Sequence, residues 1–194
     1  MNGVDLPLPD PAPRKLVHTR QLSFLGFQRE DGLWDIEARL LDVKPQAFED
    51  GVRTWEANEP VHQMVLRLTI DDDLVVQDIA VAMEVFPHGP CPQAMAPMRG
   101  LIGARLTRGW RKTINAQLGG IQGCAHLREM LVNAATAAYQ SLPIAITDPH
   151  APHPPQHYGQ CVAWDQAGPV VERHFPMFFR PRGLEQADGE QSAT

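Results

Sequence analysis

The chain has 194 residues and is short of the features that mark several large classes of protein. It has only three cysteines and no apolar run near the ~20 residues that cross a bilayer. Lysine and arginine total 17 against 23 acidic residues, so the net charge is −6, and no basic block is present. A Gly-rich phosphate loop, a Walker motif, a GxSxG elbow and an HExxH pair are also missing. We therefore expect no membrane partner, no nucleic-acid partner and no nucleotide cofactor.

The ends of the chain differ in composition from its middle. Residues 1–13 are rich in proline and acid and are typical of a flexible arm, and residues 181–194 are typical of a flexible tail. Between them we expect a single α+β domain over residues 14–180. The arm lacks the apolar segment of a secretory signal, and three cysteines is an odd number. Both observations favour reduced thiols and a cytoplasmic location.

Hydrophobic periodicity predicts strands in the first half of the domain and helices after them. A period of two is clearest at residues 34–40 and 61–70, where alternate side chains are apolar. Further strands are predicted at residues 16–27 and 74–85, and a last hairpin at residues 162–173. Helices are predicted over residues 91–105, 109–118 and 124–142. This order predicts an α+β fold, an antiparallel sheet with helices packed on one face.

Cys124 has the most informative surroundings in the chain. It follows Gly123 and opens the strongest helical pattern, and His126 is two residues further on. A thiol at a helix N-terminus faces unpaired N–H groups and the positive end of the helix dipole. These lower its pKa and favour the thiolate, the form that binds metals and attacks electrophiles. In a regular helix Cys124 and His126 would point about 200° apart, so both reach one site only if Cys124 is not yet helical.

Two further residues can join Cys124 in a site. His62 falls on the apolar face of its predicted strand, and Cys91 stands just before Pro92 at a predicted helix start. A set of His62, Cys91 and Cys124 would suit zinc or iron. The alternative is that both cysteines are small buried core residues and that His62 is a hydrogen-bonded core residue.

Two other groups of side chains are weaker candidates. Acidic and aromatic residues cluster around the second strand, where a solvated sheet face is the commoner explanation for them: Asp31, Trp34, Asp35, Glu37 and Asp42. The histidines at 150, 153 and 157 lie among prolines, which forbid a helix and favour an irregular loop over residues 148–160.

Several runs of sequence resemble a known but uncharacterised family. Residues 31–40, 62–73, 109–110 and 118–127 together resemble a proteobacterial family of uncharacterised domains, over about residues 12–180. That resemblance implies no established activity, and it associates the chain with catabolism of aromatic or acyl compounds.

A more distant resemblance is to iron–sulfur scaffold proteins of the NifU N-terminal type, over about residues 60–142. His62, Cys91 and the run Cys124-Ala125-His126-Leu127 stand where those scaffolds have ligands. The chain departs from the scaffold pattern because His62 replaces a cysteine and Met64 replaces an aspartate. The resemblance therefore implies the scaffold fold more than cluster assembly.

These observations lead us to expect a small-molecule enzyme, lyase- or hydrolase-like, that acts on aromatic or related compounds. One version is C–C cleavage such as deformylation, either cofactor-independent or assisted by zinc or iron. His62, His126 and Cys124 would be catalytic, and Trp34, Glu37 and Trp110 would contact the substrate. Two alternatives stay open, a non-catalytic metal or Fe–S carrier and an accessory subunit without chemistry. The chain length is compatible with a homodimer.

Overall fold

The computed structural model describes residues 8–107, 109–142, 153–154 and 157–182. The chain forms two compact units, Met1–Leu142 and Pro143–Thr194. The predicted single domain over residues 14–180 spans both units. Much of the predicted arm, almost all of the predicted tail and most of the loop over residues 148–160, His150 included, lie outside the described residues.

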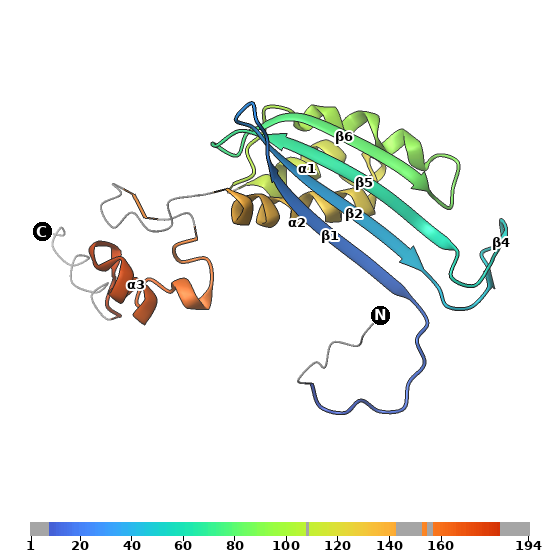
Figure 1. Cartoon of the computed structure of the whole chain (residues 1–194), viewed down its shortest axis with the longest axis horizontal. Helices are drawn as coiled ribbons and strands as arrows, with labels where there is room; N and C mark the ends of the chain where they lie inside the picture. Colours follow the sequence, from blue (N-terminus) through green and yellow to red (C-terminus); the bar gives the residue numbers. More distant parts are fainter. Residues whose placement is uncertain (1–7, 108, 143–152, 155–156, 183–194) are drawn as a thin grey trace, which may run out of the picture. The chain divides into compact units, whose positions relative to one another are not determined.

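The first unit is built on a four-stranded antiparallel sheet with the strand order β1-β2-β5-β6 (Figure 1). Its strands are β1 (Thr19–Gln28), β2 (Trp34–Val43), β5 (Pro60–Ile70) and β6 (Val76–Val85). Every neighbouring pair is antiparallel. The predicted strands are therefore confirmed, with ends shifted by a few residues.

Burial alternates along the two central strands as the period of two predicts. On β2 the buried apolar residues are Trp34, Ile36, Ala38 and Leu40, and on β5 they are Met64, Leu66, Leu68 and Ile70. Successive side chains of a strand point to opposite faces, so these residues share the inner face of the sheet. A charged residue, Asp42, follows the apolar residues of β2 on the same inner face. Its side chain is only 2% exposed.

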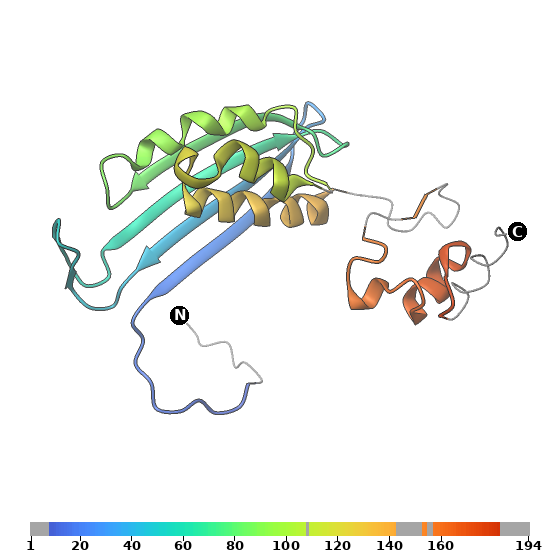
Figure 2. The same cartoon turned by 180° about the vertical axis from the view of Figure 1, so that it is seen from behind.

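Two helices, α1 (Trp110–Leu118) and α2 (Ala125–Ser141), lie across that inner face (Figure 2). The buried residues of α2 follow helical spacing and complete the core: Leu127, Met130, Leu131, Ala134 and Ala138. The fold is thus α+β, with an antiparallel sheet covered on one face by helices. Within the described ranges, no helix has the length and apolar content needed to span a membrane.

Two predicted elements are wrong. The expected helix over residues 91–105 is instead a pair of 3₁₀ helices, η1 (Cys91–Ala94) and η2 (Ala96–Leu101). Pro92 is compatible with a helix start, but Pro97 would stand in the helix interior without the N–H group needed there, and Gly103 has a φ of 85°, which lies outside helical geometry.

The second error is in the second unit. The hairpin expected at residues 162–173 is a 3₁₀ turn, η4 (Val162–Trp164), followed by a short helix, α3 (Pro169–His174). Pro169 takes the first helical position after Gly168, where proline is favoured. A further 3₁₀ turn, η5 (Pro176–Phe178), follows, and Trp164 packs against Phe175 with ring centroids 5.3 Å apart.

The connection between β2 and β5 is more ordered than its polar sequence predicts. It contains a small hairpin, β3 (Phe48–Glu49) and β4 (Thr54–Trp55), beyond the end of the sheet (Figure 1). Trp55 is 1% exposed, its indole N–H donates to Asp50 Oδ2 over 2.8 Å, and the Arg53 guanidinium lies 3.6 Å from its ring centroid. This hairpin matters for the site because it joins Asp42 on β2 to His62 on β5.

Replacing Gly26 by alanine should destabilise the fold by about 1–3 kcal/mol, the usual cost of overpacking. An added Cβ at Gly26 would lie 1.9 Å from Ser141 Oγ, because α2 approaches β1 closely there. Urea unfolding measures the loss. Gly89→Ala is the matched control, because nothing lies within 4 Å of its added Cβ. Equal stability of the two variants would show that α2 does not dock against Gly26.

The β3–β4 hairpin should keep its Asp50–Trp55 hydrogen bond well into acid. The indole of Trp55 and the N–H groups of Arg53 and Val52 lower the pKa of Asp50 from 3.8 to about 2. The stability that this carboxylate adds is complete above about pH 3.8 and is lost as the pH falls toward about 2. The Trp55 indole signal in NMR spectra should therefore stay unchanged from pH 6 to about pH 3.

A midpoint near 3.8, the ordinary value for aspartate, would contradict this assignment. Asp50→Asn is the control variant, because it has no carboxylate at position 50 to titrate.

Candidate functional site

Three polar side chains form a row across the inner face of the sheet at one end. Arg20 on β1 is the register partner of Asp42 on β2, and Asp42 is the register partner of His62 on β5. Residues directly opposite each other in antiparallel strands share a face. The backbone pairing therefore places all three on the helix-covered face, where the apolar series of β2 ends.

The Asp42 carboxylate is held by a two-pronged contact with Arg20. Arg20 Nε donates to Oδ1 over 2.8 Å and Nη2 donates to Oδ2 over 2.9 Å. His18 Nε2 lies 3.1 Å from Oδ1 as well. The remaining Arg20 nitrogen, Nη1, donates to Glu129 on α2 over 3.0 Å. Arg20 thus connects the buried carboxylate of the sheet to the helix that covers it.

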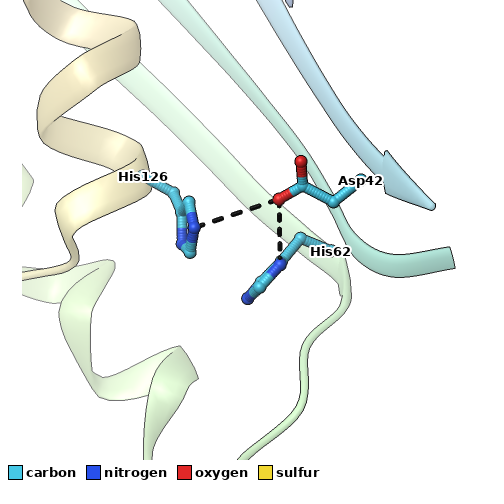
Figure 3. A group of neighbouring side chains, drawn as sticks. All are labelled: Asp42, His62 and His126. Atoms are coloured by element: carbon cyan, nitrogen blue, oxygen red, sulfur yellow. Dashed lines mark ion pairs between the residues drawn. The ribbon is translucent and has the colours of Figure 1, made fainter. Parts of the chain in front are cut away.

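Two histidines converge on the other side of the same carboxylate (Figure 3). His62 Nδ1 lies 3.0 Å from Asp42 Oδ2, and His126 Nε2 lies 3.9 Å from the same oxygen. The centroids of the two imidazole rings are 4.1 Å apart. The Nδ1 atom of His62 is buried, and despite its short distance to Oδ2 it makes no hydrogen bond of good geometry.

The charges around Asp42 decide which groups are ionised. Burial alone would raise the pKa of Asp42, but the hydrogen bonds and charge of Arg20, with smaller contributions from His62 and His18, lower it overall. Burial lowers the pKa of His62, and the nearby His126 lowers it further, while Asp42 opposes both. At neutral pH the site therefore holds an ionised carboxylate beside a neutral His62, whose unprotonated ring nitrogen can bind a metal or a proton.

Cys124 and His126 can face one site only if Cys124 is not helical, and the structure meets this condition. Cys124 is the N-cap of α2, with extended backbone angles of φ −101° and ψ 134°, so it is not yet helical. Its Sγ consequently lies 3.7 Å from Nδ1 of His126. Burial by itself would raise the pKa of Cys124, but His126 and the N–H groups of Leu127 and His126 lower it overall. The predicted direction of the thiol pKa is confirmed.

Within the described residues, three side chains with metal-binding atoms meet at one place, and they are Asp42, His62 and His126. One ligand atom from each lies within 4.8 Å of the other two. These two imidazoles and one carboxylate form a triad that could hold a metal ion. The triad shares only His62 with the predicted set of His62, Cys91 and Cys124.

The other predicted site residues lie apart from this triad or have structural partners. Trp34 and Trp110 are 7% and 4% exposed. Their indole N–H groups donate to Asp72 Oδ1 and to the Leu131 carbonyl, both over 2.9 Å, so both are core residues. Glu37 lies on the outer face of β2, where Arg39 donates to it. Cys91 is half-buried in η1.

Asp42 is the residue that the periodicity could have revealed. Its sequence neighbourhood groups it with acids for which a solvated sheet face is the commoner explanation. Its position, however, continues the alternate residues that face inward, which are Trp34, Ile36, Ala38 and Leu40. A charged residue at an inward position needs a partner. The partners, His18, Arg20 and Glu129, leave no comparable signal, because strand pairing and helix docking bring them together.

Replacing Arg20 by glutamine should destabilise the protein by about 2 kcal/mol, because a buried carboxylate loses its main partner. The loss should stay below that of a fully buried pair, since the Arg20 side chain is 34% exposed. Urea unfolding in the presence of a chelator measures it. The surface pair of Arg39 and Glu37 provides the control, and Arg39→Gln should cost less than ~0.5 kcal/mol.

Adding Asp42→Asn to the Arg20→Gln variant should recover part of the lost stability, because the unpaired charge is then gone. Equal losses for Arg20→Gln and Arg39→Gln would show that Arg20 does not stabilise Asp42.

Comparison with known proteins identifies the family to which the chain belongs. No curated protein and no solved structure matches the chain, so the predicted likeness to iron–sulfur scaffold proteins is not confirmed. The family model described as "Protein of unknown function (DUF2889)" matches residues 18–140. That range begins at His18 and contains every residue of the site described above. The chain belongs to the DUF2889 family of proteins of unknown function.

Proposed function

We propose that the chain is a small-molecule enzyme whose centre holds a divalent metal ion on Asp42, His62 and His126. The observation that carries this proposal is the convergence of two imidazole nitrogens on one carboxylate oxygen, Asp42 Oδ2. An oxygen of this kind has two lone pairs. Arg20 takes one of them, so a single position remains for two histidines. One cation bound by all three side chains would satisfy both nitrogens and the carboxylate together.

The distances between the three ligand atoms fit the size of a zinc ion or a ferrous ion. With metal–ligand bonds of ~2.1 Å, neighbouring ligand atoms in a tetrahedral site are about 3.4 Å apart. The distances from Asp42 Oδ2 to His62 Nδ1 and to His126 Nε2 are 3.0 and 3.9 Å, which bracket that value. The poor hydrogen-bond geometry of the buried His62 Nδ1 also fits a nitrogen placed to bind a metal.

The ligand types favour zinc or ferrous iron. Two imidazoles and a carboxylate, with further positions open, are typical of catalytic zinc and of non-haem iron sites. Iron–sulfur clusters need several thiolates, and no thiol belongs to this triad. The donor set therefore supports a single ion over a cluster, and a catalytic centre over an Fe–S carrier.

The reaction that we propose is lyase-like C–C cleavage, for example deformylation of a hydroxyl-bearing compound. A bound metal would supply polarisation of a substrate oxygen. The chain must supply a base, and Cys124 is placed for that role, because its pKa is lowered and its Sγ lies 3.7 Å from Nδ1 of His126. The proposal of an aromatic or related substrate rests on the family resemblance and not on Trp34 or Trp110.

A second candidate function, a thiol-dependent hydrolase or transferase, is favoured by the Cys124–His126–Asp42 arrangement. His126 presents Nδ1 to the thiol and Nε2 toward the carboxylate, at 3.7 and 3.9 Å. This is the order of groups in enzymes with a cysteine nucleophile, where the base is oriented by a third residue. The two candidates use Nε2 of His126 differently, since the first binds a metal there and the second does not.

Calorimetric titration of chelator-treated protein with Zn²⁺ or Fe²⁺ tests the metal proposal. The protein should bind one equivalent, and Asp42→Asn, His62→Gln and His126→Gln should each weaken binding by roughly 100-fold through loss of a ligand. His18→Gln is the matched control, because His18 contacts the same carboxylate through Oδ1 but is not in the triad. Its effect should be smaller than that of any triad variant.

The same preparations separate the two candidates. If neither ion binds, and if iodoacetamide labels Cys124 faster than the exposed Cys161, the thiol candidate replaces the metal proposal. Tight metal binding that survives Cys124→Ser would support the metal centre. Absence of metal binding together with an unreactive Cys124 would remove both and favour an accessory subunit without chemistry.

A further inference from the structure

A groove of about 350 Å³ lies on helices α1 and α2, and of the residues around the candidate centre only Glu129 lines it. Residues from both helices line it: Arg111, Asn115, Arg128, Glu129, Val132 and Asn133. Arg111 and Asn115 are four residues apart on α1, so they lie on the same face of that helix. The same holds for Arg128 and Val132 on α2. Its size is at the lower end of the range for small-molecule sites.

The charges of the groove favour an anion. Arg128 is held in place because its Nη1 donates to the Leu118 carbonyl over 3.0 Å, which leaves its other N–H groups for a ligand. The Arg111 side chain has no ion pair or hydrogen bond with any other residue in the described part of the chain. The one acid of the lining, Glu129, already accepts from Arg20 over 3.0 Å.

Two arginines therefore line this groove, and its one carboxylate is already paired with Arg20. A bound anion would be attracted to both positive charges. The planar guanidinium group also matches the paired oxygens of a carboxylate or a phosphate.

We propose that this groove binds the carboxylate or phosphate end of a small organic molecule, through Arg111 and Arg128. Val132 offers the neighbouring part of such a molecule an apolar contact.

The groove adjoins the candidate centre along α2. Glu129 lines the groove and also binds Arg20, which holds Asp42. His126 precedes Glu129 by three residues, a rise of about 4.5 Å along the helix. On a regular helix Arg128 points about 200° away from His126, so the groove is a separate site that shares only Glu129 with the surroundings of Asp42. Anion binding in the groove does not depend on the proposed function.

NMR titration of chelator-treated protein tests the groove directly, with benzoate and phenyl phosphate as probes and benzamide as their uncharged counterpart. Both anions should shift the side-chain N–H signals of Arg111 and Arg128, with dissociation constants on the order of 1 mM, as expected for such small probes. Whichever of the two probes binds more tightly shows whether the groove prefers a carboxylate or a phosphate. Benzamide should leave these signals unchanged.

Arg111→Gln should weaken the binding of the anions about fivefold or more, through loss of a charged hydrogen bond. It is the preferred variant, because Arg128 also supports the end of α1. Lys112→Gln is the matched control, since it removes the same charge from the next residue of α1 and does not line the groove.

Three results would overturn the inference: no shift with either anion, an equal response to benzamide, or equal weakening in the Lys112→Gln variant. Asp42→Asn separates the two proposals, because it should weaken metal binding roughly 100-fold and leave anion binding intact. Anion binding without metal binding would remove the proposed function alone. Metal binding without anion binding would remove the groove alone.

Discussion

The structure around the candidate centre depends on one interaction, the pairing of the buried Asp42 carboxylate with Arg20. Asp42 occupies a position on the inner face of the sheet that the preceding residues of β2 fill with apolar side chains, and it is 2% exposed. A charge in such a position must be matched by a partner. Arg20 provides two hydrogen bonds to the carboxylate and a third to Glu129, so the same guanidinium also ties α2 to the sheet. The ionised state of Asp42, and with it the approach of His62 and His126, follows from this pairing.

The fold determines where the charged and polar side chains of the candidate centre lie. Antiparallel register sets Arg20, Asp42 and His62 in one row, and the ordered β3–β4 hairpin connects the strands that carry Asp42 and His62. From the other side, α2 begins at Cys124 and brings His126 over the same carboxylate. Because strands and a helix terminus are rigid, the three ligand atoms can be held within bonding distance of one ion without rearrangement of the backbone. The groove on α1 and α2 is separate from this arrangement and shares only Glu129 with it.

Local patterns predicted the parts of the site that depend on neighbouring residues. Alternation along β5 placed His62 on the inner face, and the glycine before Cys124 marked the start of α2, with the thiol pKa lowered as expected. The same patterns misplaced Asp42, because they grouped it with Asp35 and Glu37, which lie on the outer face of the same strand. They also favoured Cys91, whose position before Pro92 predicted an α-helix start, whereas Pro97 further on limits the segment to 3₁₀ turns. Trp34 and Trp110 were expected at a substrate and instead complete the core, with their indole N–H groups already bonded.

The sequence by itself determined the four strands of the main sheet, the helices α1 and α2, the inward direction of His62 and the non-helical start at Cys124. Each of these depends on residues within a few positions of one another, through strand and helix periods and through glycine and proline geometry. Only the tertiary structure decided the composition of the centre. Arg20, Asp42, His62 and His126 are separated by about 20 residues or more along the chain. Strand register and the docking of α2 bring them together, and both are set by the summed packing of the core, which no local pattern contains.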